Sequence, residues 1–227
     1  MGHIVFITGT DTGAGKTVVT ALLVAFLRRR GERVAALKPI CSGGRDDAAM
    51  LRAAAGNCLT LDEVNPWHFK MPVAPLLAAK IERKSVSLPT VLSHIQAVRR
   101  GFDVTLVEGA GGLLSPLGSG FNSRDLIHRL AATPILAAPN RLGVVNAILL
   151  SLEALPRSRR EQAHVCLVDT PGDDPVKAAN VRLLRELAVP RVHCLPWLGV
   201  NFGMATVPKS AKVRRAVKEM AHAVLMG

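Results

Sequence analysis

The feature that most constrains the fold of this chain is the glycine-rich segment 8–17, Thr-Gly-Thr-Asp-Thr-Gly-Ala-Gly-Lys-Thr. An apolar run over residues 4–7 precedes it, and apolar residues at helical spacing follow over residues 18–27. This order predicts a strand, a loop and a helix. Backbone N–H groups at the start of a helix, together with the positive end of the helix dipole, favour a phosphate group. The segment therefore predicts a phosphate-binding loop.

Two residues at the end of this segment carry the expected chemistry. The Lys16 ammonium is expected to reach the β and γ phosphates of a nucleotide, and the Thr17 hydroxyl is expected to ligate magnesium. The spacing is a variant of the usual one, because Thr10 stands five residues before Gly15 and the nearest earlier glycine is Gly9. The alternative is a glycine-rich turn that binds nothing, and a Gly-Lys-Thr sequence at a strand-to-helix junction argues against it.

The length and composition of the chain fit one domain covering residues 1–227. A chain of 227 residues, of which 49% are hydrophobic, can bury a full core. Its uncharged apolar runs are far shorter than the ~20 residues that a membrane helix needs. The chain enters its first expected strand within three residues, so no secretory signal is expected. The four cysteines are scattered without a C-x-x-C pair, which indicates neither a zinc site nor a disulfide framework and makes the cytoplasm the expected location.

The formal net charge of +12 raises the question of a nucleic-acid partner. The basic clusters at residues 28–30, 157–160 and 212–215 fall at the ends or on the polar faces of predicted helices, where Lys and Arg complement the dipole without any partner. The chain has no Tyr and two Trp, which leaves few aromatic side chains for bases to stack on. We therefore expect solvated basic faces, with attraction of anionic substrates or of nucleic acid as the alternatives.

Beyond the loop, short uncharged strands alternate with helices along the chain. The pattern predicts strands over residues 33–37, 104–107, 134–138, 165–168 and 192–195. It predicts helices over 17–30, 48–55, 74–84, 87–100, 125–130, 144–155 and 175–187, and an amphipathic helix from residue 210 onwards. Short apolar strands are typical of a sheet that is covered on both faces. The expected fold is therefore α/β, a doubly wound, mostly parallel sheet of the P-loop NTPase type.

Polar residues follow several of these strands, and in such a sheet ligands bind at the carboxyl ends of the strands. The residues expected to meet there are segment 12–17, Lys38, Ser42, Asp47, segment 108–112 and Asn140. Magnesium takes oxygen ligands, which Thr17, Asp47 and Glu108 can supply. The alternatives are structural: Asp46 and Asp47 as the N-cap or first-turn acids of a helix, Glu108 as a satisfied acid at a strand end, and Lys38 as a solvated lysine.

In combination, these motifs resemble the dethiobiotin synthetase family. The markers of that family are Gly-Thr-Asp-Thr-x-x-Gly-Lys-Thr, Lys-Pro-x-x-Ser-Gly, a following Asp, Asn-Pro-aromatic-x-Phe with prolines after it, Val-Glu-Gly-Ala-Gly-Gly and Leu-Gly-x-x-Asn. Here they occupy residues 9–17, 38–43, Asp47, 65–69 with Pro72 and Pro75, 107–112 and 142–146. Their order and spacing match as far as residue 146, which is most of the chain.

The resemblance implies a magnesium- and ATP-dependent ligase that closes a ureido ring on 7,8-diaminononanoate with CO2. In the family the reaction passes through a carbamate and a carbamic-phosphoric anhydride to dethiobiotin, ADP and phosphate. The resemblance further implies catalytic roles for Thr12, Lys16 and Lys38, and a homodimer with the substrate at its interface. The implied substrate-binding residues are Ser42 and Gly111, with Gly143, Val144 and Asn146 from the neighbouring subunit. The implied nucleotide-binding residues are Gly13, Ala14, Gly15, Lys16, Thr17, Val18, Asp47, Glu108, Gly109, Ala110, Gly111, Asp169, Thr170, Pro196, Trp197 and Leu198.

Some positions depart from the family pattern. The loop before Asp47 is shorter than usual, which leaves open whether Asp46 or Asp47 meets the metal. Asp169 stands where the family commonly has an Asn that reads adenine. An Asp accepts either from the adenine amino group or from N1 and N2 of guanine, so the nucleotide preference is open. The acidic residue expected near position 201 is absent, because Asn201 and Gly203 occupy that stretch.

Three other classes of protein are the alternatives. A P-loop switch ATPase of the partitioning or division-site type would carry a second lysine five residues before Lys16, where this chain has Asp11. The amphipathic C-terminal helix and the positive charge are its support. A degenerate nucleotide-binding module is suggested by the departures at Asp169 and Gly203. An amidoligase acting on a larger cofactor precursor is not expected of a short chain without a glutaminase half.

Overall fold

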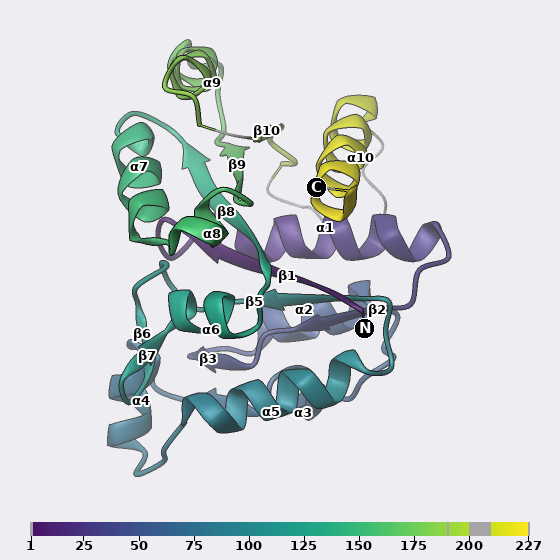
Figure 1. Ribbon diagram of the computed structural model, residues 1–227, viewed down its shortest axis with the longest axis vertical. Coiled ribbons are helices and arrows are strands. Elements are labelled where there is room, and N and C mark those ends of the chain that lie inside the picture. Colours follow the sequence, from purple (N-terminus) through teal and green to yellow (C-terminus); the bar gives the residue numbers. More distant parts are fainter. Residues whose placement is uncertain (1, 190, 200–209, 227) are drawn as a thin grey trace.

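A computed structural model describes residues 2–189, 191–199 and 210–226 of the chain (Figure 1). In these residues, six parallel strands form a central sheet in the order β10-β9-β8-β1-β5-β2. Their bounds are β1 His3–Gly9, β2 Val34–Leu37, β5 Val104–Glu108, β8 Thr133–Asn140, β9 His164–Asp169 and β10 Val192–Leu195. All the predicted strands are present, and the prediction of a doubly wound, parallel α/β sheet is confirmed. The positions of Asn201 and Gly203 lie outside the described residues.

The alternation of side chains along β1 explains why both faces of the sheet are covered. Ile4 and Phe6 belong to one buried apolar cluster, and Val5 and Ile7 belong to another, because successive side chains of a strand point to opposite faces. The first cluster includes residues of α5 Leu88–Arg99, α6 Ser123–Arg129, α7 Val144–Ala154 and α9 Val176–Glu186. The second includes residues of α1 Lys16–Arg29, α2 Asp46–Ala54 and α10 Ala211–Met226. Figure 1 shows α10 lying beside α1.

The predicted helices are confirmed, with their ends shifted by a few residues. Helix α4 is Pro75–Ile81, shorter than predicted. Helix α2 begins two residues earlier than predicted, and its N-cap is Arg45. Asp46 and Asp47 are therefore not the N-cap, and the alternative that they are acids of the first turn is confirmed. Both acids lie in the first turn of α2, where carboxylates are stabilised by the positive end of the helix dipole.

The shortest elements were not predicted. They are β3 Ile40–Ser42, α3 Leu61–Val64, β4 Trp67–Phe69, β6 Pro116–Gly118, β7 Phe121–Asn122 and α8 Arg157–Arg160. Strand β3 pairs with β4 in a small parallel ribbon, and β6 pairs with β7 in an antiparallel one. Segments of two to four residues are too short to show a hydrophobic period, so the sequence pattern could not reveal them.

The strand order places a topological switch beside β1. From β1 the chain crosses to β2 and returns to β5 on one side, and it then continues to β8, β9 and β10 on the other. In open α/β sheets, ligands bind outside the carboxyl ends of the strands at such a switch. The loop after β1 therefore lies where a ligand is expected. Within the described residues, no helix has both the length and the apolar character needed to span a membrane.

Candidate active site

The phosphate-binding loop joins β1 to α1 at the carboxyl edge of the sheet. Gly15 is the N-cap of α1 and has a φ of 88°, in the left-handed region that glycine adopts without steric cost. A Cβ atom at this position would also lie 3.0 Å from Cγ2 of Val168. A side chain is thus disfavoured here twice, by backbone conformation and by contact. The loop leaves the N-terminus of α1 open at the edge where a phosphate group would bind.

Lys16 is the first residue of α1, and it is buried. Its Nζ atom donates a hydrogen bond of 2.8 Å to the carbonyl oxygen of Asp11, so the side chain curls back over its own loop. Burial lowers the pKa of the Lys16 ammonium; the Glu108 carboxylate opposes this shift and the Lys38 ammonium adds to it. A neutral carbonyl is a weaker partner for an ammonium than a phosphate oxygen. The lysine is therefore placed to exchange that carbonyl for a phosphate.

Glu108 is the centre of the polar cluster. It is the last residue of β5 and is only 1% exposed. Its Oε1 atom accepts from Thr17 Oγ1 at 2.9 Å and from Lys38 Nζ at 2.7 Å. Its Oε2 atom lies 3.2 Å from the Thr20 hydroxyl. A carboxylate this deeply buried needs such partners, since an unpaired buried charge is strongly destabilising.

Lys38 follows β2 and joins the two candidate metal-binding acids. Its Nζ atom also forms an ion pair with Oδ2 of Asp47, so of the two adjacent acids it is Asp47 that reaches the cluster. Burial by itself lowers the pKa of the Lys38 ammonium, but the carboxylates of Glu108 and Asp47 outweigh it and the pKa is raised overall. The ammonium is therefore charged at neutral pH, and the alternative of a solvated lysine is wrong, since the side chain is 8% exposed.

The donor set fits a magnesium ion whose remaining ligands come from a nucleotide. It comprises the Thr17 hydroxyl and the carboxylates of Asp47 and Glu108, which are linked through one oxygen of Glu108 and through Lys38. In the part of the chain that the structure describes, no three or more His, Cys, Asp or Glu residues gather in a group able to hold a metal by themselves. Mg²⁺ typically uses one or two carboxylates together with substrate phosphates and water, so this sparse set suits it.

The glycine-rich segment after β5 packs against the phosphate-binding loop. Gly109 donates a backbone hydrogen bond of 2.9 Å to Ile7, and a Cβ on Gly112 would lie 3.1 Å from the carbonyl oxygen of Thr10. A Cβ on Gly111 would lie 4.0 Å from the Thr12 hydroxyl. The structure thus brings these predicted site segments together.

Three predicted site residues lie at the surface or are engaged with the backbone. Thr12 is exposed, and its backbone N–H donates to its neighbour Asp11 at 2.6 Å. Ser42, at the end of β3, donates its hydroxyl to the carbonyl oxygen of Val73 at 2.5 Å. Ala110 is partly buried against the apolar core. Their roles toward a substrate or nucleotide stay predictions.

A second group of predicted site residues lies at the ends of β8 and β9. Oδ1 of Asp169 accepts from the side-chain amide of Asn140 at 2.9 Å, and Asn180 of α9 donates to Oδ1 of Asn140 at 3.0 Å. Lys177 donates to the carbonyl oxygen of Thr170 at 2.7 Å. After β10, on the neighbouring strand, come Pro196, Trp197 and Leu198, of which Trp197 is 46% exposed. The half-buried Asp169 is therefore already paired with an amide donor.

The third group lies at the start of α7 and is kept apart from Lys38. Gly143 is the N-cap of α7, the Val144 side chain is buried in the core, and Asn146 is exposed. Helix α7 follows β8, whereas Lys38 follows β2, and β1 and β5 lie between these strands. The structure does not bring this group together with the cluster around Lys38 within one chain.

Sequence reasoning missed several residues that support the cluster. Thr20 contacts Glu108, Ser115 accepts from the backbone N–H of Gly112 at 2.9 Å, and Asn65 donates to the backbone of Lys38. For Thr20 a signal was present: it lies four residues after Lys16, on the buried face of a helix, where a hydroxyl needs a partner. The sequence placed Asn65 in a motif, but it did not indicate that Asn65 contacts the backbone of Lys38.

Comparison with known proteins identifies relatives by sequence. The model of a family described as "AAA domain" matches residues 3–200. The ATP-dependent dethiobiotin synthetase BioD of Bacillus subtilis is 31% identical over 229 residues, covering 97% of this chain and 96% of its own. The enzyme of the same name from Methanococcus vannielii is 36% identical over 151 residues, covering 66% of this chain and 72% of its own.

Comparison with solved structures identifies the fold. The septum site-determining protein MinD of Pyrococcus horikoshii, solved with Mg-ADP, superposes with a TM-score of 0.59 and covers 100% of this chain and 98% of its own. The two sequences are 18% identical, so this likeness concerns the arrangement of the sheet and helices alone. It confirms the P-loop NTPase type of fold predicted from the sequence.

Proposed function

The chain belongs to the ATP-dependent dethiobiotin synthetases, and from that membership we propose how its own residues carry out the reaction. The activity is that of a ligase that uses ATP and forms carbon–nitrogen bonds in dethiobiotin synthesis. We propose that the substrates are 7,8-diaminononanoate, CO2 and a nucleoside triphosphate. The cluster around Glu108 is the proposed reaction centre.

The proposed reaction has three bond-forming steps. One amine of the substrate adds to CO2, loses a proton and becomes a carbamate. A carbamate oxygen attacks the γ phosphorus of ATP, the bond to the bridging oxygen breaks, and ADP leaves. The second amine then attacks the carbonyl carbon of the mixed anhydride, phosphate leaves, and the ring closes. The chain has to hold charged reactants together and in line, and no strong general base is required once the carbamate exists.

The buried lysines suit that task. In the proposal, Lys16 interacts with the transferring phosphoryl group and Lys38 holds the carbamate next to it, because both ammonium groups lie in one cluster at the switch point. Backbone N–H groups of the loop bind the phosphates, and they come from Gly13, Ala14, Gly15, Thr17 and Val18. Thr12 and Ser42 orient the diamine and the carbamate.

Magnesium is the proposed cofactor. Thr17, Asp47 and Glu108 are the residues that would hold it, together with phosphate oxygens. When bound, it neutralises charge on the phosphates. The pairing of Lys38 with Asp47 and Glu108 supports this proposal, since it demonstrates that these oxygens accept a cation.

The nucleobase is proposed to bind between the ends of β9 and β10. Asp169 and Thr170 lie on one side, and Pro196, Trp197 and Leu198 lie on the other. The contact between Val168 and Gly15 joins this region to the phosphate-binding loop. A carboxylate at position 169 offers only acceptors, and the side-chain amide of Asn140 already uses one of its oxygens.

A homodimer in the cytoplasm is proposed as the working form. The exposed face of α7 and the turn before it carry Leu142, Leu149 and Leu150, which are 83%, 38% and 64% exposed. A groove of about 400 Å³ beside them is lined by both helical and loop residues, among them Asn146 and Leu187. Exposed apolar surface of this kind is typical of an interface. In a dimer, Gly143, Val144 and Asn146 of one chain would reach the substrate of its partner.

The observation that carries the proposal is the buried Lys38–Glu108–Thr17 arrangement beside the phosphate-binding loop in a chain of this family. The test is phosphate release by the purified protein with magnesium, bicarbonate and ATP, with and without 7,8-diaminononanoate, repeated with GTP and CTP. Release that depends on the diamine is expected. Slow release that ignores the diamine would overturn the proposal and favour a switch ATPase, although that class would carry a second lysine where this chain has Asp11.

A further inference from the structure

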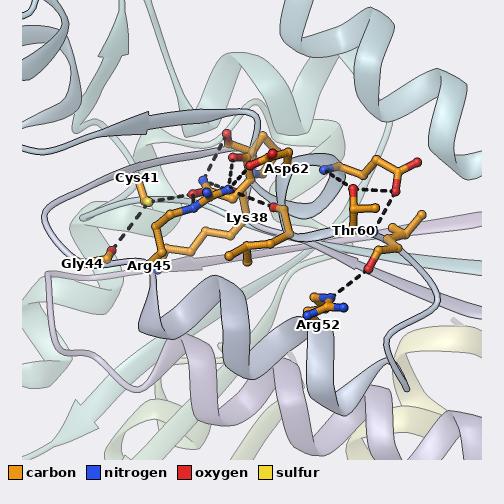
Figure 2. A network of polar contacts seen from close by, with 12 residues as sticks. Lys38, Cys41, Gly44, Arg45, Arg52, Thr60 and Asp62 are labelled. Carbon is orange, nitrogen blue, oxygen red and sulfur yellow. Dashed lines mark hydrogen bonds and ion pairs between the residues drawn. The ribbon is translucent and has the colours of Figure 1, made fainter.

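We infer that Asn65 and Arg45, to which no role in the reaction has been given above, are positioning residues that hold Lys38 and Asp47 in register with Glu108. The inference rests on the proposed function only in that Lys38 is taken to act in turnover. Its basis is a network of polar contacts, buried around Asn65 and partly buried around Arg45, between the segment after β2, the start of α2 and the short helix α3 (Figure 2). Asn65 belongs to the Asn-Pro motif at residues 65–69, which has no part in the proposed reaction steps.

Asn65 holds the backbone of Lys38. Its side-chain amide donates to the carbonyl oxygen of Lys38 at 2.7 Å and lies 3.4 Å from that of Pro39. The preceding residue, Val64, accepts from the backbone N–H of Lys38 at 3.0 Å. Lys38 is thus held at both backbone polar atoms by two consecutive residues, while its Nζ atom is held by the two acids.

The orientation of the Asn65 side chain is determined by its donors. Its Oδ1 atom lies 3.1 Å from the Cys41 thiol and 3.2 Å from Nε of Arg45, and both of these groups donate. The opposite face meets only carbonyl oxygens, so the NH₂ group must lie there. Asn65 is 1% exposed, and no water can replace these partners cheaply. Arg45 therefore acts on Lys38 through the amide that it orients.

Arg45 also fixes the short helix that carries Asn65. Its Nη2 atom donates to the carbonyl oxygens of Leu61 and Asn65, each at 3.0 Å, and to Oδ1 of Asp62 at 2.8 Å. The N-terminus of α3 is closed by a capping box between Thr60 and Glu63. One guanidinium thereby ties the helix to the start of α2.

The same arginine places Asp47. Arg45 is the N-cap of α2, and Asp47 lies two residues later in the first turn. Any movement of Arg45 relative to Asn65 shifts the Asp47 carboxylate relative to the Lys38 ammonium. Arg45 thus joins the start of α2, which carries Asp47, to α3 and Asn65, which hold Lys38. Among the described residues, the phosphate-binding loop before α1 has no contact in this network. The inference predicts that the chemical step is affected most, with a smaller effect on ATP binding through Asp47, which is a proposed magnesium ligand.

The test compares Arg45→Met with Arg52→Met, a matched control on the same helix. Arg52 donates to the carbonyl oxygen of Leu59 at 3.1 Å and lies with Thr60 on the far side of the network in Figure 2. We expect Arg45→Met to lower kcat about 10- to 100-fold and to change KM for ATP less than kcat, as for outer-shell partners of a reaction centre. Arg45→Lys is expected to recover part of kcat. The control is expected to leave kcat and KM as in the unaltered protein.

A second variant and a second measurement keep the test independent of folding and of turnover. Asn65→Asp keeps the size of the side chain but sets a carboxylate oxygen against the carbonyl of Lys38, so it is expected to lower kcat as Arg45→Met does. Acetylation of Lys38 by acetic anhydride, measured by mass spectrometry relative to the exposed Lys80, is expected to be faster in both variants, because Lys38 is no longer held.

The outcomes separate the two proposals. If Lys38 acetylation and kcat in Arg45→Met and Asn65→Asp match those of Arg52→Met, the positioning role is overturned. A drop in kcat without faster acetylation of Lys38 would overturn it as well, since Lys38 would then be held as in the unaltered protein. If the unaltered protein shows no turnover dependent on the diamine, the proposed function fails, and the acetylation rates still decide whether Asn65 and Arg45 hold Lys38.

Discussion

The phosphate side of the candidate site, on β1, β2 and β5, differs in construction from the nucleobase side, on β8, β9 and β10. On the phosphate side Lys38 and Glu108 are buried and pair with each other, and Lys38 also pairs with the more exposed Asp47. On the nucleobase side the acid, Asp169, is half-buried, and it pairs with the neutral amide of the buried Asn140. Removing the partner of a buried charge is strongly destabilising, whereas a half-buried group that loses its partner can form a hydrogen bond with water instead. The chemistry is therefore expected to reside in the rigid side and the adaptable choice of base in the other.

The largest expected effect comes from breaking the phosphate side at Lys38. Lys38→Met is expected to lower kcat about 10²- to 10³-fold, as for other losses of a preorganised charge. It leaves Glu108 buried without its cation, so the free energy of unfolding is expected to fall by about 3–5 kcal/mol. Steady-state kinetics and urea denaturation measure the two effects.

Two further variants sharpen this result. Adding Glu108→Gln to Lys38→Met removes the unpaired charge, and it is expected to restore stability without restoring turnover. On the nucleobase side, Lys177→Met removes a lysine that contacts only backbone carbonyls among the partners described for it, and kcat is expected to stay near that of the unaltered protein. An active Lys38→Met variant would remove the distinction between the two sides.

The next effect concerns the half of the sheet that contains β9 and β10, and the loss of its stability at low pH. At the amino ends of β9 and β10, the ring of His164 lies stacked on that of His193, with Nδ1 and Nε2 3.0 Å apart. Burial, and then the charges of His193, Arg191 and His3, lower the pKa of His164 from 6.5 to about 3. Between pH 6.5 and about pH 3, the unfolded chain therefore binds a proton at His164 that the folded chain does not bind. The contribution of His164 to the free energy of unfolding is therefore complete above pH 6.5 and is lost as the pH falls toward 3.

By this linkage, His164 is expected to account for about 2 kcal/mol of stability lost between pH 7.5 and pH 5. His164→Gln keeps a polar partner for His193 but does not titrate, so its melting temperature is expected to fall less steeply over that range. His128→Gln, at an exposed position on α6, is the control and is expected to keep the original slope. Equal slopes in all three proteins would contradict the assignment.

A smaller effect concerns the choice of nucleotide. Asp169→Asn replaces an acceptor with a group that both donates and accepts, while Asn140 and Asn180 stay in place. The ratio of kcat/KM for ATP to that for GTP is expected to rise about tenfold, which is one hydrogen bond's worth of discrimination. The kcat at saturating ATP is expected to stay unchanged, because the phosphate side is untouched. A ratio that does not move would place the base away from Asp169.

The sequence predicted some features of the site and not others. The motifs around Lys16, Lys38 and Glu108 were predictable because each follows a strand whose apolar run ends at the site edge. The choice of Asp47 over Asp46 was not, because it depends on the position of the α2 N-terminus, which Arg45 sets through contacts 16 to 20 residues away. The contacts that matter most for precision link residues far apart in sequence, and periodicity carries no information about them.

The fold was likewise predictable wherever elements were long. Strands β1, β5 and β8 and helix α1 appear where the apolar pattern placed them. The ribbon of β3 and β4 and the helix α3 were missed, because three or four residues define no period. These same small elements carry Ser42 and precede Asn65. The sequence therefore predicted the proposed reacting groups, and it did not predict the small elements that lie beside them.

The smallest predicted effect tests that alignment inside the phosphate side itself. Thr20 is fully buried, and its hydroxyl lies 2.8 Å from the carbonyl oxygen of Lys16 and 3.2 Å from Oε2 of Glu108. Thr20→Val keeps the shape and removes the hydroxyl, so stability is expected to fall by about 1 kcal/mol. If the hydroxyl also fixes the Glu108 carboxylate in the transition state, kcat falls about fivefold with it.

Thr105→Val is the matched control, because it makes the same change on the strand that carries Glu108. Thr105 is as fully buried as Thr20, but within the described part of the chain its hydroxyl has no hydrogen-bond partner. Removing an unsatisfied buried hydroxyl is expected to leave stability unchanged or slightly higher, with kcat unaffected. A loss in Thr105→Val equal to that in Thr20→Val would mean that both effects come from packing. In that case the carboxylate of Glu108 is held by Thr17 and Lys38 without help from α1's second turn.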